Sequence, residues 1–187
     1  MNSTEQKIIE AAHYLFFHFG FKKTSVDEIA ARAGVGKGTI YNYFSDKEEL
    51  FKKLALTTSQ AVKSHVEQEI APFTQADERV FQRFAREFKF FQSQRASFGT
   101  TKALMEEMFE VCNKMEALMD TKREGLHQDL ALGVKQGLFK EMNVEETGQT
   151  LVTIWSQFII KWLYMDEEEM QKEQTAVLTL MIDGIRA

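Results

Sequence analysis

The stretch from Lys37 to Tyr43, KGTIYNY, combines a cation, a hydroxyl group and two phenols. Lysine side chains bind phosphates or base edges, and tyrosine hydroxyls donate hydrogen bonds to phosphate oxygens. Tyr41 and Tyr43 stand two residues apart, so on a helix they project to different sides and can flank it. This stretch therefore has the composition of a short helix that contacts a nucleic acid.

A second pattern has the spacing of a metal site. Glu10 and His13 form one Glu-x-x-His pair, and Glu124 and His127 form another; di-iron carboxylate bundles use this pair twice. The two copies lie far apart along the chain, and the sequence contains no Walker-type loop, Gly-x-Ser-x-Gly or Cys-x-x-Cys motif. We therefore expect no enzyme activity, metal or cofactor, and keep a helical-bundle metalloenzyme as an alternative.

The elements that position these residues are all expected to be helices. The chain contains one proline, Pro72, and no run of alternating β-branched residues, which predicts an all-α fold. Capping boxes that begin at Ser3, Ser25 and Ser45 predict three helix starts, and Asn143 predicts a fourth cap. The pattern predicts helices over 3–19, 25–33, 37–44, 46–70, 75–95, 143–165 and 168–185, with a break inside 97–140 that it does not locate.

Charge and composition limit the compartment and the partners. The 187 residues carry a net charge of −5, but residues 1–53 hold eight Lys/Arg against seven Asp/Glu. The acidity therefore belongs to the C-terminal part, and the N-terminal part permits a local DNA footprint. The polar N-terminus, the absence of a long apolar run and the single Cys112 predict a cytoplasmic protein without a membrane partner.

The segment IIEAAHYLFFHFGFKKTSVDEIAARAGVGKGTIYNYFSDKEELF closely resembles the DNA-binding domain of the TetR family of bacterial transcriptional regulators. The resemblance covers about residues 6–53. It depends on the order and spacing of T-S-V-x-x-I-A, A-G-V, K-G-T-I-Y-x-Y-F and K-E-E-L, and it departs from the family at Gly36, where the family often has serine. It implies an N-terminal three-helix helix-turn-helix DNA-binding domain over 1–53 and a helical ligand-binding and dimerisation domain over 54–187.

The resemblance also implies which residues contact DNA. Thr24 and Ser25 would touch phosphate at the start of the motif, and Lys47 would bind another phosphate at the next helix start. The tip of the second motif helix would reach bases, and the residues after it would hold phosphates. The expected DNA-binding set is Thr24, Ser25, Lys37, Gly38, Thr39, Tyr41, Asn42, Tyr43 and Lys47.

The C-terminal part shows apolar faces but no motif that names a ligand. Phenylalanines recur on one narrow face of 75–95, and methionines, which suit adaptable pockets, recur at helical spacing from Met105 to Met119. Either set is also consistent with plain core. The residues expected to line a cavity for a small apolar effector are Phe88, Phe91, Met105, Phe109, Met115 and Trp155.

The last two helices carry apolar faces wider than a surface helix needs. About half the circumference of 144–165 and of the final helix is apolar, which predicts burial against both the protein's own core and a second subunit. In the family these helices usually form a four-helix bundle between subunits. The residues expected in the dimer interface are Trp155, Phe158, Ile159, Trp162, Val177 and Met181.

These observations predict a homodimeric repressor that binds a palindromic double-stranded operator and is released by a small, largely apolar ligand. The ligand would change the separation of the two recognition helices, with the helix over 46–70 as the lever. Two alternatives stay open: the metalloenzyme, and a TetR-like protein that binds a protein partner in place of DNA.

Overall fold

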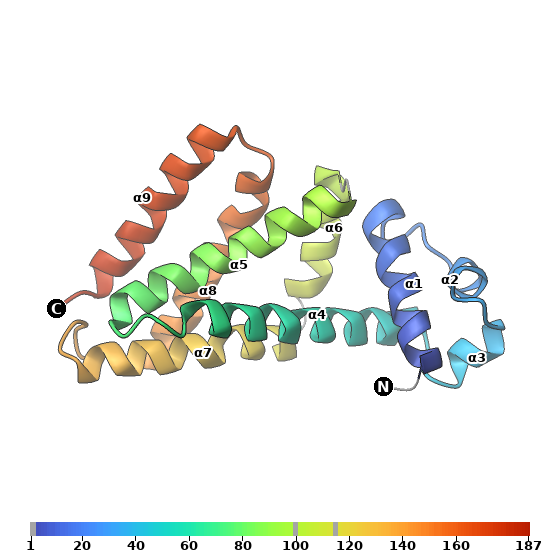
Figure 1. Cartoon of the computed structure of the whole chain (residues 1–187), viewed down its shortest axis with the longest axis horizontal. Coiled ribbons are helices and arrows are strands. Elements are labelled where there is room, and N and C mark those ends of the chain that lie inside the picture. The colour runs from blue at the N-terminus through green and yellow to red at the C-terminus, as the bar shows by residue number, and fades with distance from the viewer. Residues whose placement is uncertain (1–2, 99–100, 114–115) are drawn as a thin grey trace. The chain divides into compact units, whose positions relative to one another are not determined.

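The computed structural model describes residues 3–98, 101–113 and 116–187, and its regular elements in these ranges are α-helices (Figure 1). They confirm the all-α prediction. Within the described residues, the only pairing of the β type is an isolated bridge between Phe139 and Arg186. The helices are α1 Ser3–Phe19, α2 Val26–Ala33, α3 Lys37–Tyr41, α4 Lys47–Ile70, α5 Ala76–Phe98, α6 Lys102–Asn113, α7 Glu116–Lys135, α8 Val144–Leu163 and α9 Glu167–Ile185.

Local sequence signals place several helix ends where they were expected. The Ser25 side chain accepts from the Glu28 N–H, and the Glu28 carboxylate accepts from the Ser25 N–H at 2.7 Å, which is the predicted capping box of α2. These hydrogen bonds, led by the one from the Ser25 backbone, lower the pKa of Glu28. Asn143 caps α8 by accepting from Glu145 and Glu146, as predicted.

Three boundaries differ from the sequence-based expectation. The cap of α4 is Asp46, not Ser45: Asp46 Oδ1 accepts from the Glu49 N–H at 2.7 Å, and the Glu49 carboxylate accepts from the Ser45 N–H. The third helix ends at Tyr41 and continues as a turn that carries Phe44 into the core. The range 97–140, in which the sequence pattern left one break open, is divided twice: between α5 and α6 and between α6 and α7.

The first compact unit combines Met1–Ser59 with Arg95–Leu118, and therefore contains α1, α2, α3 and α6. Its core consists of apolar side chains from α1 to the start of α4. Phe16, Phe21 and Phe51 are mutually in ring contact, with centroids 5.0 to 5.6 Å apart. The buried set is Ile8, Ile9, Ala11, Ala12, Leu15, Phe16, Phe21, Ile29, Ala30, Ile40, Phe44, Leu50, Phe51 and Leu54.

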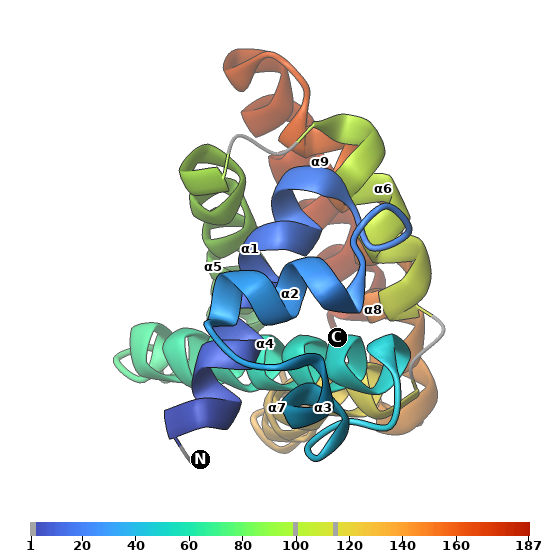
Figure 2. The ribbon, with the colours of Figure 1, turned by 90° about the vertical axis from the view of Figure 1, so that its right-hand side faces the viewer.

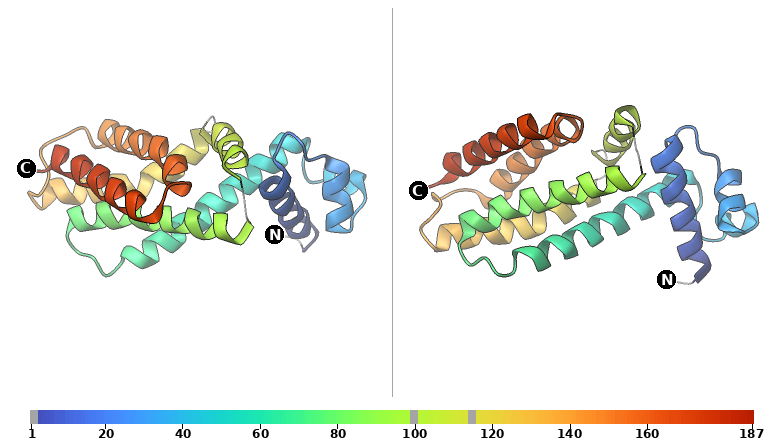
Figure 3. Two further views of the ribbon diagram at one scale, coloured as in Figure 1. Left: turned by 90° about the horizontal axis from the view of Figure 1, so that it is seen from above. Right: turned by 45° about the horizontal axis from the view of Figure 1, so that its top comes forward.

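The second unit combines Gln60–Gln94 with Met119–Ala187. In it the C-terminal half of α4 runs alongside α5 and α7, and α8 and α9 follow (Figure 3). One part of the interior is aromatic, where Phe84 and Phe88 of α5 contact Trp155 of α8. Another part is ionic, around the buried Asp129 of α7.

The ionic part joins three helices. Asp129 is 1% exposed and accepts from Arg79 Nε at 2.6 Å, from Arg83 Nε at 2.8 Å and from Arg83 Nη2 at 2.7 Å. Arg83 also donates to Glu67 of α4 at 2.7 Å. Gly125 leaves room for this arrangement, since a Cβ there would lie 2.5 Å from Arg83 Nη1. The network therefore connects α4, α5 and α7 through charge-assisted hydrogen bonds.

The two units do not follow the predicted division at residue 53, because the first unit also includes Arg95–Leu118. The functional domains 1–53 and 54–187 stay a prediction. None of the described helices is both long and apolar enough to cross a membrane.

Candidate nucleic-acid interface

Helices α2 and α3 and the turn between them form a helix-turn-helix (Figure 2). Gly34 ends α2 in the left-handed conformation, with φ of 69°, and its N–H bonds to carbonyl oxygens of Ala30 and Ala31. Residues with a side chain rarely adopt this conformation, so glycine makes the sharp turn possible. On the inner side, Ile29 and Ile40 are buried, which fixes α3 on the scaffold of α1 and α2.

The N-terminal end and outer side of α3 are open to solvent. Lys37, Gly38 and Asn42 are exposed, and the Tyr41 side chain is 48% exposed although it is a large apolar ring. A Cβ at Gly38 would have no neighbouring atom within 4 Å, so nothing in the described protein covers this backbone. Thr39 and Tyr43 are half-buried. This surface presents a cation, hydroxyl groups and uncovered backbone together, which suits a nucleic acid.

Lys37 is held by a neighbouring carboxylate in the free protein. Its ammonium donates to Asp27 Oδ2 of α2 at 2.8 Å, and both side chains are about half exposed or more, 49% and 67%. The hydrogen bond and charge of Asp27 raise the pKa of Lys37. A DNA phosphate or base edge would compete with Asp27 for this cation.

Replacing Asp27 by asparagine should therefore tighten DNA binding. The ammonium is released and one repelling carboxylate is lost, so we expect about a two- to fivefold gain in affinity at low salt, the scale of an exposed ion pair. Fluorescence anisotropy with a labelled operator measures it, and Glu141→Gln, the same charge change at an exposed position of the second unit, is the control. The gain should vanish in a Lys37→Ala background; if it persists there, Asp27 does not act through Lys37.

Ser25 is exposed at the start of α2, where a phosphate contact was expected. Its hydroxyl already takes part in the capping box with Glu28, to which it donates at 2.7 Å. A phosphate at this helix start would meet the exposed Ser25 side chain and the partial positive charge of the first turn of α2.

Two residues of the expected DNA-binding set direct their polar atoms into the protein. Thr24 is 3% exposed, and its hydroxyl donates to the Gly20 carbonyl oxygen at 2.8 Å. The Lys47 ammonium donates to the carbonyl oxygens of Phe21 and Thr24, both at 2.9 Å, and lies 4.4 Å from the centre of the Phe21 ring. Both residues close the turn between α1 and α2, so we leave them out of the DNA contacts proposed below.

Helix α6 contacts that same turn, a feature that sequence reasoning missed. The backbone N–H of Lys22 donates to Glu107 Oε1 at 2.7 Å, across 85 residues of chain. Gly20 has a φ of +93°, and a Cβ there would lie 2.9 Å from Leu104 Cδ2 of α6. Glycine is therefore required at position 20 for two reasons: the backbone conformation of the turn and the close approach of α6. The adjacent Lys22 and Lys23 are exposed and add cations that were visible in sequence but were not assigned.

The residues expected to line an effector cavity are divided between the two units. Phe88 and Trp155 are buried and in edge-to-face contact, with centroids 6.3 Å apart, and Phe91 is half-buried in the same unit. Met105 is buried, but in the first unit. Met115 and the side chain of Phe109 lie outside the described residues.

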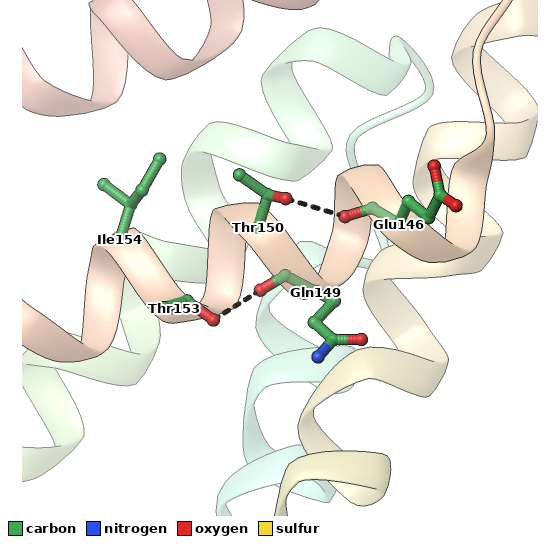
Figure 4. A pocket seen from close by; sticks show the side chains of 5 residues that line it. All are labelled: Glu146, Gln149, Thr150, Thr153 and Ile154. Carbon is green, nitrogen blue, oxygen red and sulfur yellow. Dashed lines mark hydrogen bonds between the residues drawn. The ribbon is translucent and has the colours of Figure 1, made fainter.

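A hollow of about 360 Å³ lies elsewhere, on the exposed side of α8 (Figure 4). It is lined by Glu146, Gln149, Thr150, Thr153 and Ile154. The hydroxyls of Thr150 and Thr153 already donate to carbonyl oxygens one turn earlier, at 2.9 and 2.8 Å. It contains none of the residues predicted to bind a ligand, and both of its hydroxyl groups donate within the helix.

In each Glu-x-x-His pair the glutamate side chain bonds to another side chain of its own unit. Glu10 accepts from Gln6, Glu124 pairs with Lys63, and the two copies belong to different units. In the ranges that the structure describes, no three His, Cys, Asp or Glu side chains gather as metal ligands would.

Four residues of the expected dimer interface are interior residues of the single chain. Ile159 is 0% exposed, Trp155 and Trp162 are 1% exposed and Met181 is 7% exposed. They pack within the second unit and offer no surface to a partner in this conformation. Phe158 and Val177 are partly exposed, and two other side chains of the wide apolar faces are exposed, Ile154 on α8 at 36% and Leu180 on α9 at 73%.

Comparison with known proteins agrees with the helix-turn-helix geometry of α2 and α3. Residues 8–54 match the sequence model of a family described as bacterial regulatory proteins, tetR family. An uncharacterized HTH-type transcriptional regulator of Bacillus subtilis, YhgD, is 30% identical over 162 residues, which is 83% of this chain and 82% of that protein.

Two further matches concern fatty acids. The fatty acid metabolism regulator protein of Bacillus subtilis is 24% identical over 182 residues, 96% of this chain and 94% of the relative. The crystal structure of FadR from Bacillus subtilis in complex with stearoyl-CoA superposes with a TM-score of 0.78 at 22% identity, over 96% of this chain and 98% of that one. At this identity the structural likeness establishes the fold.

Proposed function

The chain belongs to the TetR family of bacterial transcriptional regulators, and on this premise we propose that it is a homodimeric repressor that binds a palindromic operator through α3. The observation that carries the proposal is the open tip of α3, where Lys37, Gly38 and Tyr41 face solvent on a buried three-helix scaffold. Regulators of this family are not enzymes, and no catalytic role is proposed for any residue.

The proposed DNA contacts follow from exposure. The N-terminal end of α3 enters the major groove, where Lys37 and Thr39 meet base edges and the uncovered backbone at Gly38 allows close approach. Ser25, Tyr41, Asn42 and Tyr43 lie at the flanks and meet phosphates, which fix the register without reading sequence. The turn cations Lys22 and Lys23 add a phosphate contact beside them.

We propose that the dimer forms through the exposed sides of α8 and α9. Leu180 is 73% exposed and stands one turn from the partly exposed Val177. Ile154 and Phe158 are likewise one turn apart on α8, so each helix leaves an apolar pair uncovered. Burial of such pairs is the driving force for association.

Leu180→Glu should convert the dimer into a monomer. The substitution costs little in a single chain because the position is exposed, but in the dimer it buries an unpaired charge, at several kcal/mol. Sedimentation velocity at micromolar concentration measures the change. Thr175→Glu, about 140° around the same helix, should stay dimeric; an equal loss of dimer in both variants, or a monomeric wild type, contradicts this interface.

We propose that the effector carries a long apolar chain, of the acyl-CoA class. Two observations support this class: the resemblance to a fatty acid metabolism regulator and to FadR with stearoyl-CoA, and the aromatic interior formed by α5 and α8. Such a chain gains free energy by leaving water for an apolar interior. The ligand acts only through its different affinity for the DNA-bound and released forms.

Release would follow from a change in the separation of the two α3 helices, which must be about 34–36 Å for one palindrome. The α6 contact offers a route, because Glu107 holds the Lys22 N–H in the turn from which α2 starts. A shift of α6 would therefore move this turn. The continuous α4, which contributes residues to both units, is a second lever.

The experiment that tests the function is selection of bound sequences from random duplex DNA by the wild-type protein, followed by titration of the selected site with and without stearoyl-CoA. We expect a palindromic consensus with half-sites about one helical turn apart, and release on addition of the ligand. Enrichment of no sequence, combined with capture of one specific protein, would favour the alternative in which the fold serves a protein partner. Sequence enrichment without release would leave a DNA-binding regulator whose effector is not an acyl-CoA.

A further inference from the structure

The two tryptophans of the chain, Trp155 and Trp162, form a feature that DNA binding does not explain. Both are 1% exposed, and both indole N–H groups are buried without an acceptor among the described residues. They stand two turns apart on α8 and therefore share one side of the helix. Their ring centroids are 5.0 Å apart in an edge-to-face arrangement.

The second unit also buries Arg86 Nε, His127 Nε2 and Gln174 Nε2 without a hydrogen-bond partner among the described residues, but the two indoles are the pair in direct ring contact. An indole N–H can only donate, and a buried Trp normally finds a partner for it. The fully buried polar residues of the same unit show the usual pattern: Arg83 and Asp129 bond to each other, and Ser156 donates to the Val152 carbonyl at 2.8 Å. Phenylalanine would fill apolar space without the cost of an unmade hydrogen bond, so the two indoles point to a missing acceptor.

The surroundings define the chemistry of that acceptor. The Trp155 ring contacts Phe84 at 5.0 Å, and the Trp162 ring contacts Phe88 at 5.8 Å and stacks on Phe158 at 5.3 Å. These neighbours are apolar, so an ionised oxygen among them would be unpaired. The guanidinium groups of α5 already face carboxylates: Arg79 and Arg83 are bound to Asp129 and Glu67, and Arg86 lies 3.6 Å from Glu69. An uncharged oxygen on an apolar molecule suits these surroundings, and a carbonyl oxygen attached to an apolar chain is an acceptor of this kind.

We propose that this aromatic cluster of α5 and α8, Phe84, Phe88, Trp155, Phe158 and Trp162, binds the acyl end of an ester or thioester. The carbonyl oxygen accepts a hydrogen bond from the indole N–H of Trp155 or Trp162, and the chain packs against the phenylalanine rings. Phe158, which is only partly buried, is the ring that moves to admit it. This inference rests on the proposed effector class and names the groups that would recognise it.

The chain itself supplies the probe, because its only two indoles are in the cluster. Spectra of ¹⁵N-labelled protein contain two indole N–H signals, which are recorded with stearoyl-CoA and with S-octadecyl-CoA, a thioether that keeps the chain and lacks the carbonyl oxygen. We expect stearoyl-CoA to move at least one indole proton downfield. The thioether should bind roughly three- to tenfold more weakly, the scale of one hydrogen bond, and leave that signal without the downfield shift.

A matched variant isolates the donor. Replacing Trp155 or Trp162 by β-(3-benzothienyl)alanine keeps the shape of the ring and exchanges N–H for sulfur. At one of the two positions it should weaken stearoyl-CoA binding by roughly three- to tenfold and leave thioether binding unchanged. Phe88→Leu, which alters the wall but keeps both donors, should weaken both ligands alike.

The operator affinity of the ligand-free protein, measured on the same samples, separates this inference from the proposed function. If stearoyl-CoA binds while both indole signals stay in place, or if the sulfur variants lose both ligands equally, the assigned donors are wrong and the regulator stands. If stearoyl-CoA does not bind at all, the acyl class is wrong for this cluster. If the free protein selects no DNA, the proposed function fails whatever the indoles show.

Discussion

Replacing Asp129 by alanine should lower the free energy of unfolding of the second unit by about 3–5 kcal/mol. The carboxylate is 1% exposed and receives hydrogen bonds from Arg79 and Arg83. Without it, the two guanidinium groups keep only Glu67 as a charged partner, although Arg79 also keeps its hydrogen bonds to the carbonyl oxygens of Ile70 and Phe73. Removing one partner of a buried ion pair lowers the free energy of unfolding by more than the intact pair contributes to it. The reason is that the remaining charge stays buried without its partner and without water.

Urea unfolding followed by tryptophan fluorescence measures this effect, because both tryptophans are in the second unit. Asp120→Ala is the matched control: it removes an exposed aspartate from the same helix, where it pairs with Arg123, and should cost under about 1 kcal/mol. Protein concentration must be held fixed, since dimerisation would add to the apparent stability. A difference between the two variants of less than about 1 kcal/mol would show that the buried network contributes no more than a surface pair.

Replacing Lys37 by alanine should weaken operator binding by about 1–3 kcal/mol for each half-site. A dimer loses this contact at both half-sites, so the two losses add. The residue is exposed at the start of α3 and has a surface partner, Asp27, so its removal should leave the free energy of unfolding within about 0.5 kcal/mol of wild type. If Lys37 meets a base edge, the loss falls mainly on the cognate site. If it meets a phosphate, all sequences weaken alike and the salt dependence becomes shallower.

Anisotropy titrations on cognate and scrambled DNA at three salt concentrations distinguish these outcomes. Tyr41→Phe, which removes only the hydroxyl, should weaken both DNAs equally, as expected for a phosphate contact. Lys135→Ala, the same change at an exposed position of the second unit, should have no effect beyond its charge. Wild-type affinity in both Lys37→Ala and Tyr41→Phe would remove α3 from the DNA interface.

The sequence by itself determined the features that depend on neighbours in the chain. Capping at Ser25 and Asn143, the glycine that ends α2 and the helical spacing of apolar residues act over three or four residues, so the pattern predicts them without knowledge of the fold. The helix-turn-helix was readable for the same reason, since its elements follow one another at fixed spacing. Even there, Asp46 rather than Ser45 capped α4, because two adjacent residues can both serve and the chain entering the helix selects one.

Only the tertiary structure decided what each polar or aromatic group faces. Thr24 and Lys47 match a DNA-contact pattern, but the Thr24 hydroxyl and the Lys47 ammonium donate to carbonyl oxygens of the α1–α2 turn. The wide apolar face of α8 predicted a partner subunit at Trp155 and Trp162, whereas Phe84 and Phe88 of α5 cover them.

The pairing of Arg83 with Asp129 spans 46 residues and that of Lys22 with Glu107 spans 85. Such contacts leave no periodic signal, because they depend on where separate helices meet. The hydrophobicity of a side chain predicts that it is buried. The packing of the other helices decides whether it is buried in its own core, in a ligand site or against a second subunit.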